Sequence, residues 1–180
     1  MLFLQASTYP LELFGDADRL AKEAAKHPCL DGRNITTPEE RTFARSAIFV
    51  AFNFVESLLI ELVQRCLASE EIDEAIRIEI NDALKNAGAS ISRTIKEWPA
   101  KLGKTEVHGR AEFRDFKPLR QLRNNLMHPK LQPMEPNELS HDALLQEANA
   151  QKAAWAVGEV KKMGRALYEA FGHAVPPEFV

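Results

Sequence analysis

Cysteine is scarce in this sequence, and the two that occur, Cys29 and Cys66, are too few for a disulfide framework. Both fit a reducing compartment, and Cys66 lies in a strongly apolar stretch where a buried, unreactive thiol is expected. No uninterrupted apolar run reaches the length of a membrane span, about eighteen residues. The first residues, MLFLQASTYP, lack the basic segment of a secretory signal. We therefore expect a cytoplasmic protein that does not contact a membrane.

Several kinds of site are also missing from the sequence. It contains no glycine-rich phosphate loop and no serine-nucleophile motif. His27, His108 and His141 do not have metal-ligand spacing with the two cysteines. The sequence accordingly predicts no metal and no cofactor. Trp98 and Trp155 are interpreted as core or interface aromatics.

Helical patterning, in contrast, extends over almost the whole chain. The 180 residues, 45% of them hydrophobic, are enough for one domain with its own core. Helices are predicted over 11–26, 37–68, about 70–87, 89–98, 115–127 and 140–171, with no convincing strand. The predicted fold class is all-α, an up-and-down helical bundle of four to five main helices. We expect a single domain over 1–180, with a short helix and loop in 1–36 and a loose tail in 173–180.

The longest predicted helix has the strongest start signal. Thr37 is expected to be its N-cap, with Pro38 at the first helical position and Glu40 completing a capping box. Over residues 47–63 this helix is apolar nearly all round. Such a helix must be central in the bundle or covered by a second subunit.

Other helix boundaries are predicted from proline and from capping residues. Pro99 is expected to end the helix over 89–98. Asp115 is expected to cap the next helix, with Pro118 in its first turn, and Ser140 to cap the last one.

Charge is distributed unevenly along the chain. Between Arg93 and Lys130 there are ten basic and four acidic residues, a local charge of +6. Since the whole chain carries −3, the remainder carries −9. Such a segment either presents a positive face to a polyanion or is neutralised by acidic residues elsewhere in the fold. The candidate RNA-binding residues in it are Arg114, Lys117, Arg120 and Lys130.

The stretch RNNLMHPK, residues 123–130, combines groups that suit phosphodiester chemistry. The Arg123 guanidinium can hold phosphate oxygens and keeps its proton. His128 can take or give a proton near neutral pH. Because Pro129 pushes His128 out of helical geometry, the imidazole is expected at the helix end, within reach of Arg123. In the alternative interpretation, both side chains have only a structural role and complement the dipole of a helix C-terminus.

The motif and its helical setting resemble the HEPN superfamily, named for higher eukaryotes and prokaryotes nucleotide-binding domains. Its members are small helical bundles with an R-x(4–6)-H motif, often with a polar residue after the arginine. LRNNLMHP is similar to the four-residue form over about residues 116–130, and the helical layout agrees over most of the chain. The resemblance implies a homodimer in which two motifs meet. It also implies cytoplasmic roles in toxin–antitoxin or phage-defence systems, with a possible antitoxin or regulatory protein partner.

What the resemblance implies chemically is a metal-independent endoribonuclease. Arg123 would stabilise the transition state, His128 would act as general base or acid, and Asn124 would be their polar partner. The products would be a 2′,3′-cyclic phosphate and a 5′-OH. Some toxin members have tyrosine two residues after the histidine. Lys130 stands there in this chain, which sets it apart from that subgroup.

Three further residues are supporting candidates for the same site. Asn125 could orient the imidazole or donate to phosphate. Glu56 and Asn53, on an otherwise apolar helix, could lie across the bundle from Arg123 or Arg120, or could form a structural ion pair or remain exposed.

Two other functions stay open. One is a non-catalytic HEPN-like module that binds a nucleotide, RNA or a protein partner. The other is an unrelated interaction protein that uses residues 47–63 as its surface.

Overall fold

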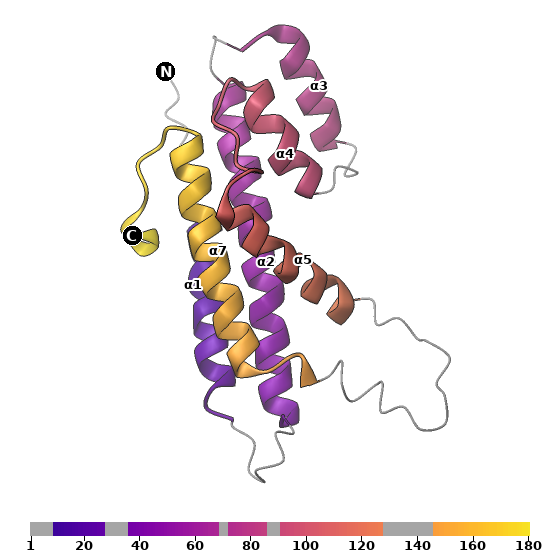
Figure 1. The fold of residues 1–180 in the computed structure, drawn as a ribbon, viewed down its shortest axis with the longest axis vertical. Helices are drawn as coiled ribbons and strands as arrows, with labels where there is room; N and C mark the ends of the chain where they lie inside the picture. Colours follow the sequence, from indigo (N-terminus) through magenta and orange to yellow (C-terminus); the bar gives the residue numbers. More distant parts are fainter. Residues whose placement is uncertain (1–8, 28–35, 69–71, 86–90, 128–145) are drawn as a thin grey trace, which may run out of the picture.

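A computed structural model of the chain describes residues 9–27, 36–68, 72–85, 91–127 and 146–180 (Figure 1). Within these ranges the regular structure is entirely helical, which confirms the all-α class. The elements are α1 (Tyr9–Ala24), α2 (Pro38–Leu67), α3 (Glu74–Lys85), α4 (Ile91–Lys101), α5 (Ala111–Met127), α7 (Ala150–Ala170) and a short 3₁₀ turn, η1 (Pro177–Phe179). Their buried apolar side chains form one hydrophobic core.

The central element is α2, as its all-round apolar character predicts. Thr37 caps it, accepting a hydrogen bond from the backbone N–H of Glu40 at 3.0 Å. Phe52 is 2% exposed, so the apolar face is covered by other helices of the same chain. Among the described helices, α2 alone has the length and hydropathy to cross a membrane, and 56% of its most apolar window is buried inside the protein. That burial is what a core helix requires.

The directions of three helices follow from contacts at their ends. Phe14 lies against Phe54 and His27 stacks on Phe43, so α1 runs antiparallel to α2 (Figure 1). In contrast, α7 runs in the same direction as α2, because α3, α4 and α5 intervene along the chain. With three described helices between them, this shared direction of α2 and α7 agrees with up-and-down order.

Buried Glu40 connects the starts of α2 and α7. Its Oε1 accepts a hydrogen bond from the backbone N–H of Ala150 at 3.0 Å, which satisfies one free donor in the first turn of α7. The predicted capping box would have used this carboxylate at the start of α2 itself, as an acceptor for the backbone N–H of the N-cap residue. The structure uses it to join two helices that are distant in sequence.

Several helix boundaries differ from the predictions, and three of the differences concern a residue that was expected to cap or end a helix. In α4 the helix passes through Pro99 and ends at Lys101. The bond from Leu102 N–H to the Trp98 carbonyl continues the last turn, and both side chains are buried. The proline therefore costs one internal hydrogen bond without ending the helix.

The other two differences concern helix starts. In α5 the helix begins at Ala111, because buried Phe113 requires a helical turn before Asp115 and Pro118. In α7 the cap is Asn149, whose side chain accepts from the N–H of Lys152. The predicted cap Ser140 lies outside the described residues.

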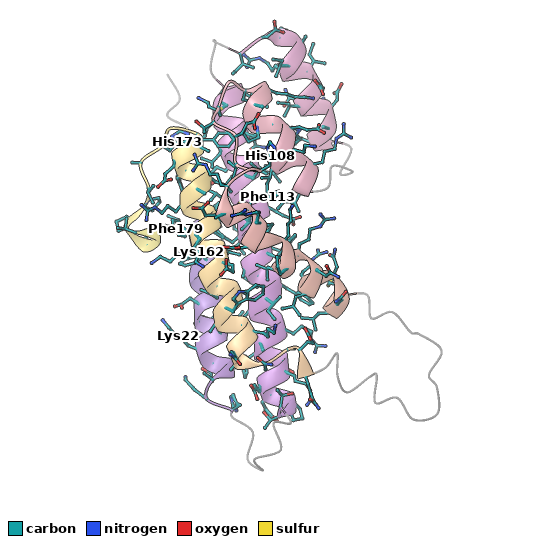
Figure 2. All side chains as sticks on the ribbon, in the orientation of Figure 1. Lys22, His108, Phe113, Lys162, His173 and Phe179 are labelled. Carbon is teal, nitrogen blue, oxygen red and sulfur yellow. The ribbon has the colours of Figure 1, made fainter. Side chains whose placement is uncertain are left out.

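The C-terminal residues depart from the expected loose tail. Phe179 is 2% exposed and packs against Phe14, Phe54 and Tyr168. The buried ring and a hydrogen bond from Lys161 Nζ to the Val180 carbonyl at 3.1 Å hold the last turn, η1, against the bundle (Figure 2).

Candidate functional site

The last turns of α5 position the motif arginine. The residues Phe113, Phe116, Leu119 and Leu122 form the buried face of α5, which packs on α2 and α7. Arg123 follows directly on this face and is half-buried. Its guanidinium carbon lies 5.1 Å from the centre of the Phe52 ring on α2, and its Nη1 donates to Asn124 Oδ1 at 3.0 Å. The ring and the amide together hold the guanidinium in place.

Glu56 lies one turn beyond Phe52 on α2, within the electrostatic reach of Arg123. Burial raises the pKa of the Glu56 carboxyl, and the positive charge of Arg123 opposes that rise. Asn53, one turn earlier on α2, is exposed. The structure thus brings together Arg123, Asn124 and Glu56 between α2 and the end of α5.

Glu56 lies in the wall of a small, mostly apolar pocket of about 200 Å³. The pocket lies between α2, α3 and α4, and is lined by Glu56, Leu59, Ile60, Ala83, Leu84, Ile91, Thr94 and Trp98. Most of these side chains are apolar, which lowers the local polarity around the carboxylate. The volume is below that of usual ligand sites, about 300–1,000 Å³. We interpret the pocket as the environment of Glu56 and not as a nucleotide site.

The predicted residues are divided between two faces of α5. Arg114 and Arg123 are nine residues apart, so on an ideal helix they point about 180° from each other. Arg114, Lys117 and Asn125 line a second pocket, which opens between α5 and α7. Arg120 is half-buried. The structure therefore separates the candidate RNA-binding residues Arg114 and Lys117 from the candidate catalytic arginine.

The candidate proton-transfer residue follows directly on the helix that carries Arg123. His128 follows Met127, the last residue of α5, and lies outside the described residues together with Lys130. The geometry between Arg123 and His128 stays a prediction.

Other ionisable groups form no comparable site. Burial raises the pKa of the Cys66 thiol, which makes it a poor nucleophile. His173, which the sequence interpretation left out, has a lowered pKa because of burial and the nearby charges of Arg65 and Lys104. Over the ranges that the structure describes, no group of three His, Cys, Asp or Glu side chains could hold a metal ion.

Two residues of the second pocket were missed as functional candidates. Lys152 and Trp155 come from α7, and only the fold brings them beside α5. Their spacing of three residues places them on one face of a helix, but nothing in the sequence indicates that this face meets Arg114 and Lys117.

Comparisons of this chain with protein-family models, curated proteins and solved structures find no match.

Proposed function

We propose that this protein is a cytoplasmic, metal-independent endoribonuclease of HEPN type. The observation that carries the proposal is the fixed position of Arg123, held by Phe52 and Asn124 at the helix end that leads directly to His128. A guanidinium held in advance stabilises developing charge without reorganising during the reaction. Its partial exposure leaves it accessible to a phosphate.

The proposed reaction uses the substrate's own nucleophile. His128 takes the proton from a ribose 2′-OH, and the 2′ oxygen attacks the adjacent phosphorus. The bond from phosphorus to the 5′ oxygen breaks, and that oxygen takes a proton from water or from the protonated His128. Arg123 balances the extra negative charge on the phosphate oxygens in the transition state. The products are a 2′,3′-cyclic phosphate and a 5′-OH.

Asn124 and Glu56 have positioning roles in this scheme. Asn124 holds one nitrogen of the guanidinium, and Glu56 balances its charge from α2. Asn125 and exposed Asn53 are further polar groups near the helix end and on α2, respectively. As the resemblance implies, two copies would bring two motifs into one cleft, and an antitoxin or other regulatory protein would control them.

Cleavage of a mixed RNA pool in EDTA tests the proposal. Wild type should cut and leave cyclic-phosphate ends. His128→Ala and Arg123→Ala should each lose activity by about 100-fold or more, as expected for a proton-transfer group and for a charge-stabilising donor. Circular dichroism and sedimentation should first show that the three proteins fold and assemble alike. Equal cleavage by all three would contradict the assignment of the motif.

A second candidate function is a non-catalytic HEPN-like module that binds RNA. The observation favouring it is the second pocket, whose basic residues face away from Arg123. RNA bound there would not need the motif at all. Tight RNA binding without cleavage, unchanged in His128→Ala, would support this alternative.

A further inference from the structure

The second pocket is the larger of the two beside the candidate site, at about 440 Å³. Its α5 side is lined by Arg114, Lys117, Pro118, Gln121, Leu122 and Asn125, and its α7 side by Glu147, Lys152 and Trp155. Figure 2 shows the two helices side by side, with Phe113 in the first turn of α5 and Lys162 on α7. The volume is in the range of small-molecule and nucleotide sites.

Three cations line this pocket, Arg114, Lys117 and Lys152, and none of them pairs with a carboxylate of the described residues. Among the described residues, no acidic side chain lies within ion-pair distance of Arg114, Lys117 or Lys152. Other basic residues nearby are paired with carboxylates: Lys162 with Glu159 at 2.9 Å, and Arg165 and Arg110 with Glu169. Among the described residues, Glu147 is the one acidic residue of the lining. This described lining carries three positive charges and one negative charge, a balance that attracts an anion.

The uncharged part of the lining suits a nucleobase. Trp155 is half-buried and forms one wall, with the Lys152 ammonium 5.7 Å from its ring centre. Gln121 and Asn125 bring two side-chain amides to the same space. An aromatic wall, amides and cations together are what proteins use to hold the base and phosphate of single-stranded nucleic acid. An acidic peptide would use the cations but would leave the ring and the amides without a role.

We propose that the pocket between α5 and α7 binds one nucleotide of a single-stranded RNA, with its phosphate on Lys117, Lys152 and Arg114 and its base against Trp155. The identity of the ligand as RNA rests on the proposed function. A strand that occupies this pocket and also reaches Arg123 passes over the last turn of α5. The pocket therefore selects RNA that is unpaired on one side of the scissile phosphate.

The test uses a fluorescein-labelled, single-stranded 2′-O-methyl RNA, which lacks the free 2′-OH and is not cleaved. Fluorescence anisotropy at low salt gives its Kd. Lys117→Gln and Lys152→Gln should each weaken binding by about tenfold, as for loss of a charge-assisted hydrogen bond. Glu147→Gln should tighten binding because it removes the one negative charge. Lys22→Gln on α1 removes the same charge elsewhere (Figure 2) and should leave the Kd unchanged.

The proposal is overturned if both lysine variants bind the RNA with the wild-type Kd. It is also overturned if Lys22→Gln weakens binding as much as the pocket variants do. Displacement of the RNA by a glutamate-rich peptide of equal charge at similar concentration would also overturn it, since the base would contribute nothing. Both lysines are exposed, so the variants should keep the wild-type melting temperature.

The two proposals fail separately. Weaker binding in the lysine variants supports the pocket even if no cleavage is found, in which case the endoribonuclease assignment falls. If cleavage depends on Arg123 while the lysine variants bind RNA normally, the pocket proposal is contradicted and the active-site proposal is supported.

Discussion

At the scale of single residues, Glu56 is the group whose ionisation depends most directly on the candidate site. Burial raises its pKa above the ordinary value of 4.5, and the attraction of Arg123 does not cancel this. The folded state thus holds the proton more tightly than the unfolded state. The contribution of Glu56 to stability is greatest below about pH 4.5 and declines as the pH rises above that value.

Glu56→Gln should therefore gain stability relative to wild type between about pH 4 and pH 7. Because the side chain is half-exposed, we expect a gain of about 1 kcal/mol or less. Urea unfolding of both proteins at several pH values measures it. A difference that moves in favour of wild type as the pH rises would mean that attraction to Arg123 outweighs burial.

Helix geometry could have divided the candidate residues more finely than the sequence interpretation did. Arg114 was grouped with the Arg123 site, although their spacing of nine residues places them on opposite sides of a helix. Spacing gives no distance to Phe52 or Glu56, because those contacts depend on how α5 crosses α2. Lys152 and Trp155 could not be assigned to the same pocket as Lys117 for the same reason.

At the scale of elements, the close contact between α2 and α7 depends on a glycine. A Cβ atom at Gly164 of α7 would lie 2.9 Å from Cζ and 3.1 Å from Cε1 of Phe54. Phe54 is fully buried, and its ring packs against Phe14 and Phe179. The ring therefore has little freedom to move away.

Gly164→Ala should destabilise the protein by about 1–3 kcal/mol, as for overpacking of a core. Gly158→Ala is the matched control on the same helix, since nothing lies within 4 Å of its added Cβ. That variant should gain up to about 1 kcal/mol from helix propensity. Thermal and urea unfolding measure both. Stabilisation of both variants to the same extent would contradict close α2–α7 packing.

Elements were predicted well where the start signal is local. Thr37 and Pro38 set the start of α2, and its apolar run indicated its central place. The start of α5 was missed because tertiary packing of Phe113 took precedence over the cap expected at Asp115. The cap of α7 at Asn149 was not predicted. The end of α4 was missed because packing of Leu102 outweighs the cost of Pro99.

At the scale of the whole molecule, charge limits where RNA can bind. The chain carries −3, although residues 93–130 carry +6, so most of its surface repels a polyanion. Binding must then depend on few contacts. The candidates are Arg123 on one side of α5 and Arg114, Lys117 and Lys152 around the pocket on the other.

The salt dependence of RNA binding measures how many phosphates these cations neutralise. Each phosphate neutralised on a single strand contributes about −0.7 to the slope of log K against log salt concentration. Two phosphates, one in the pocket and one at Arg123, predict a slope of about −1.4, which should move towards about −0.7 in Lys152→Gln and stay unchanged in Lys22→Gln. Anisotropy titrations with the 2′-O-methyl RNA over a range of NaCl concentrations measure it. A steep slope that no single variant alters would indicate diffuse attraction to the basic segment, and an RNA strand would then have no defined path across α5.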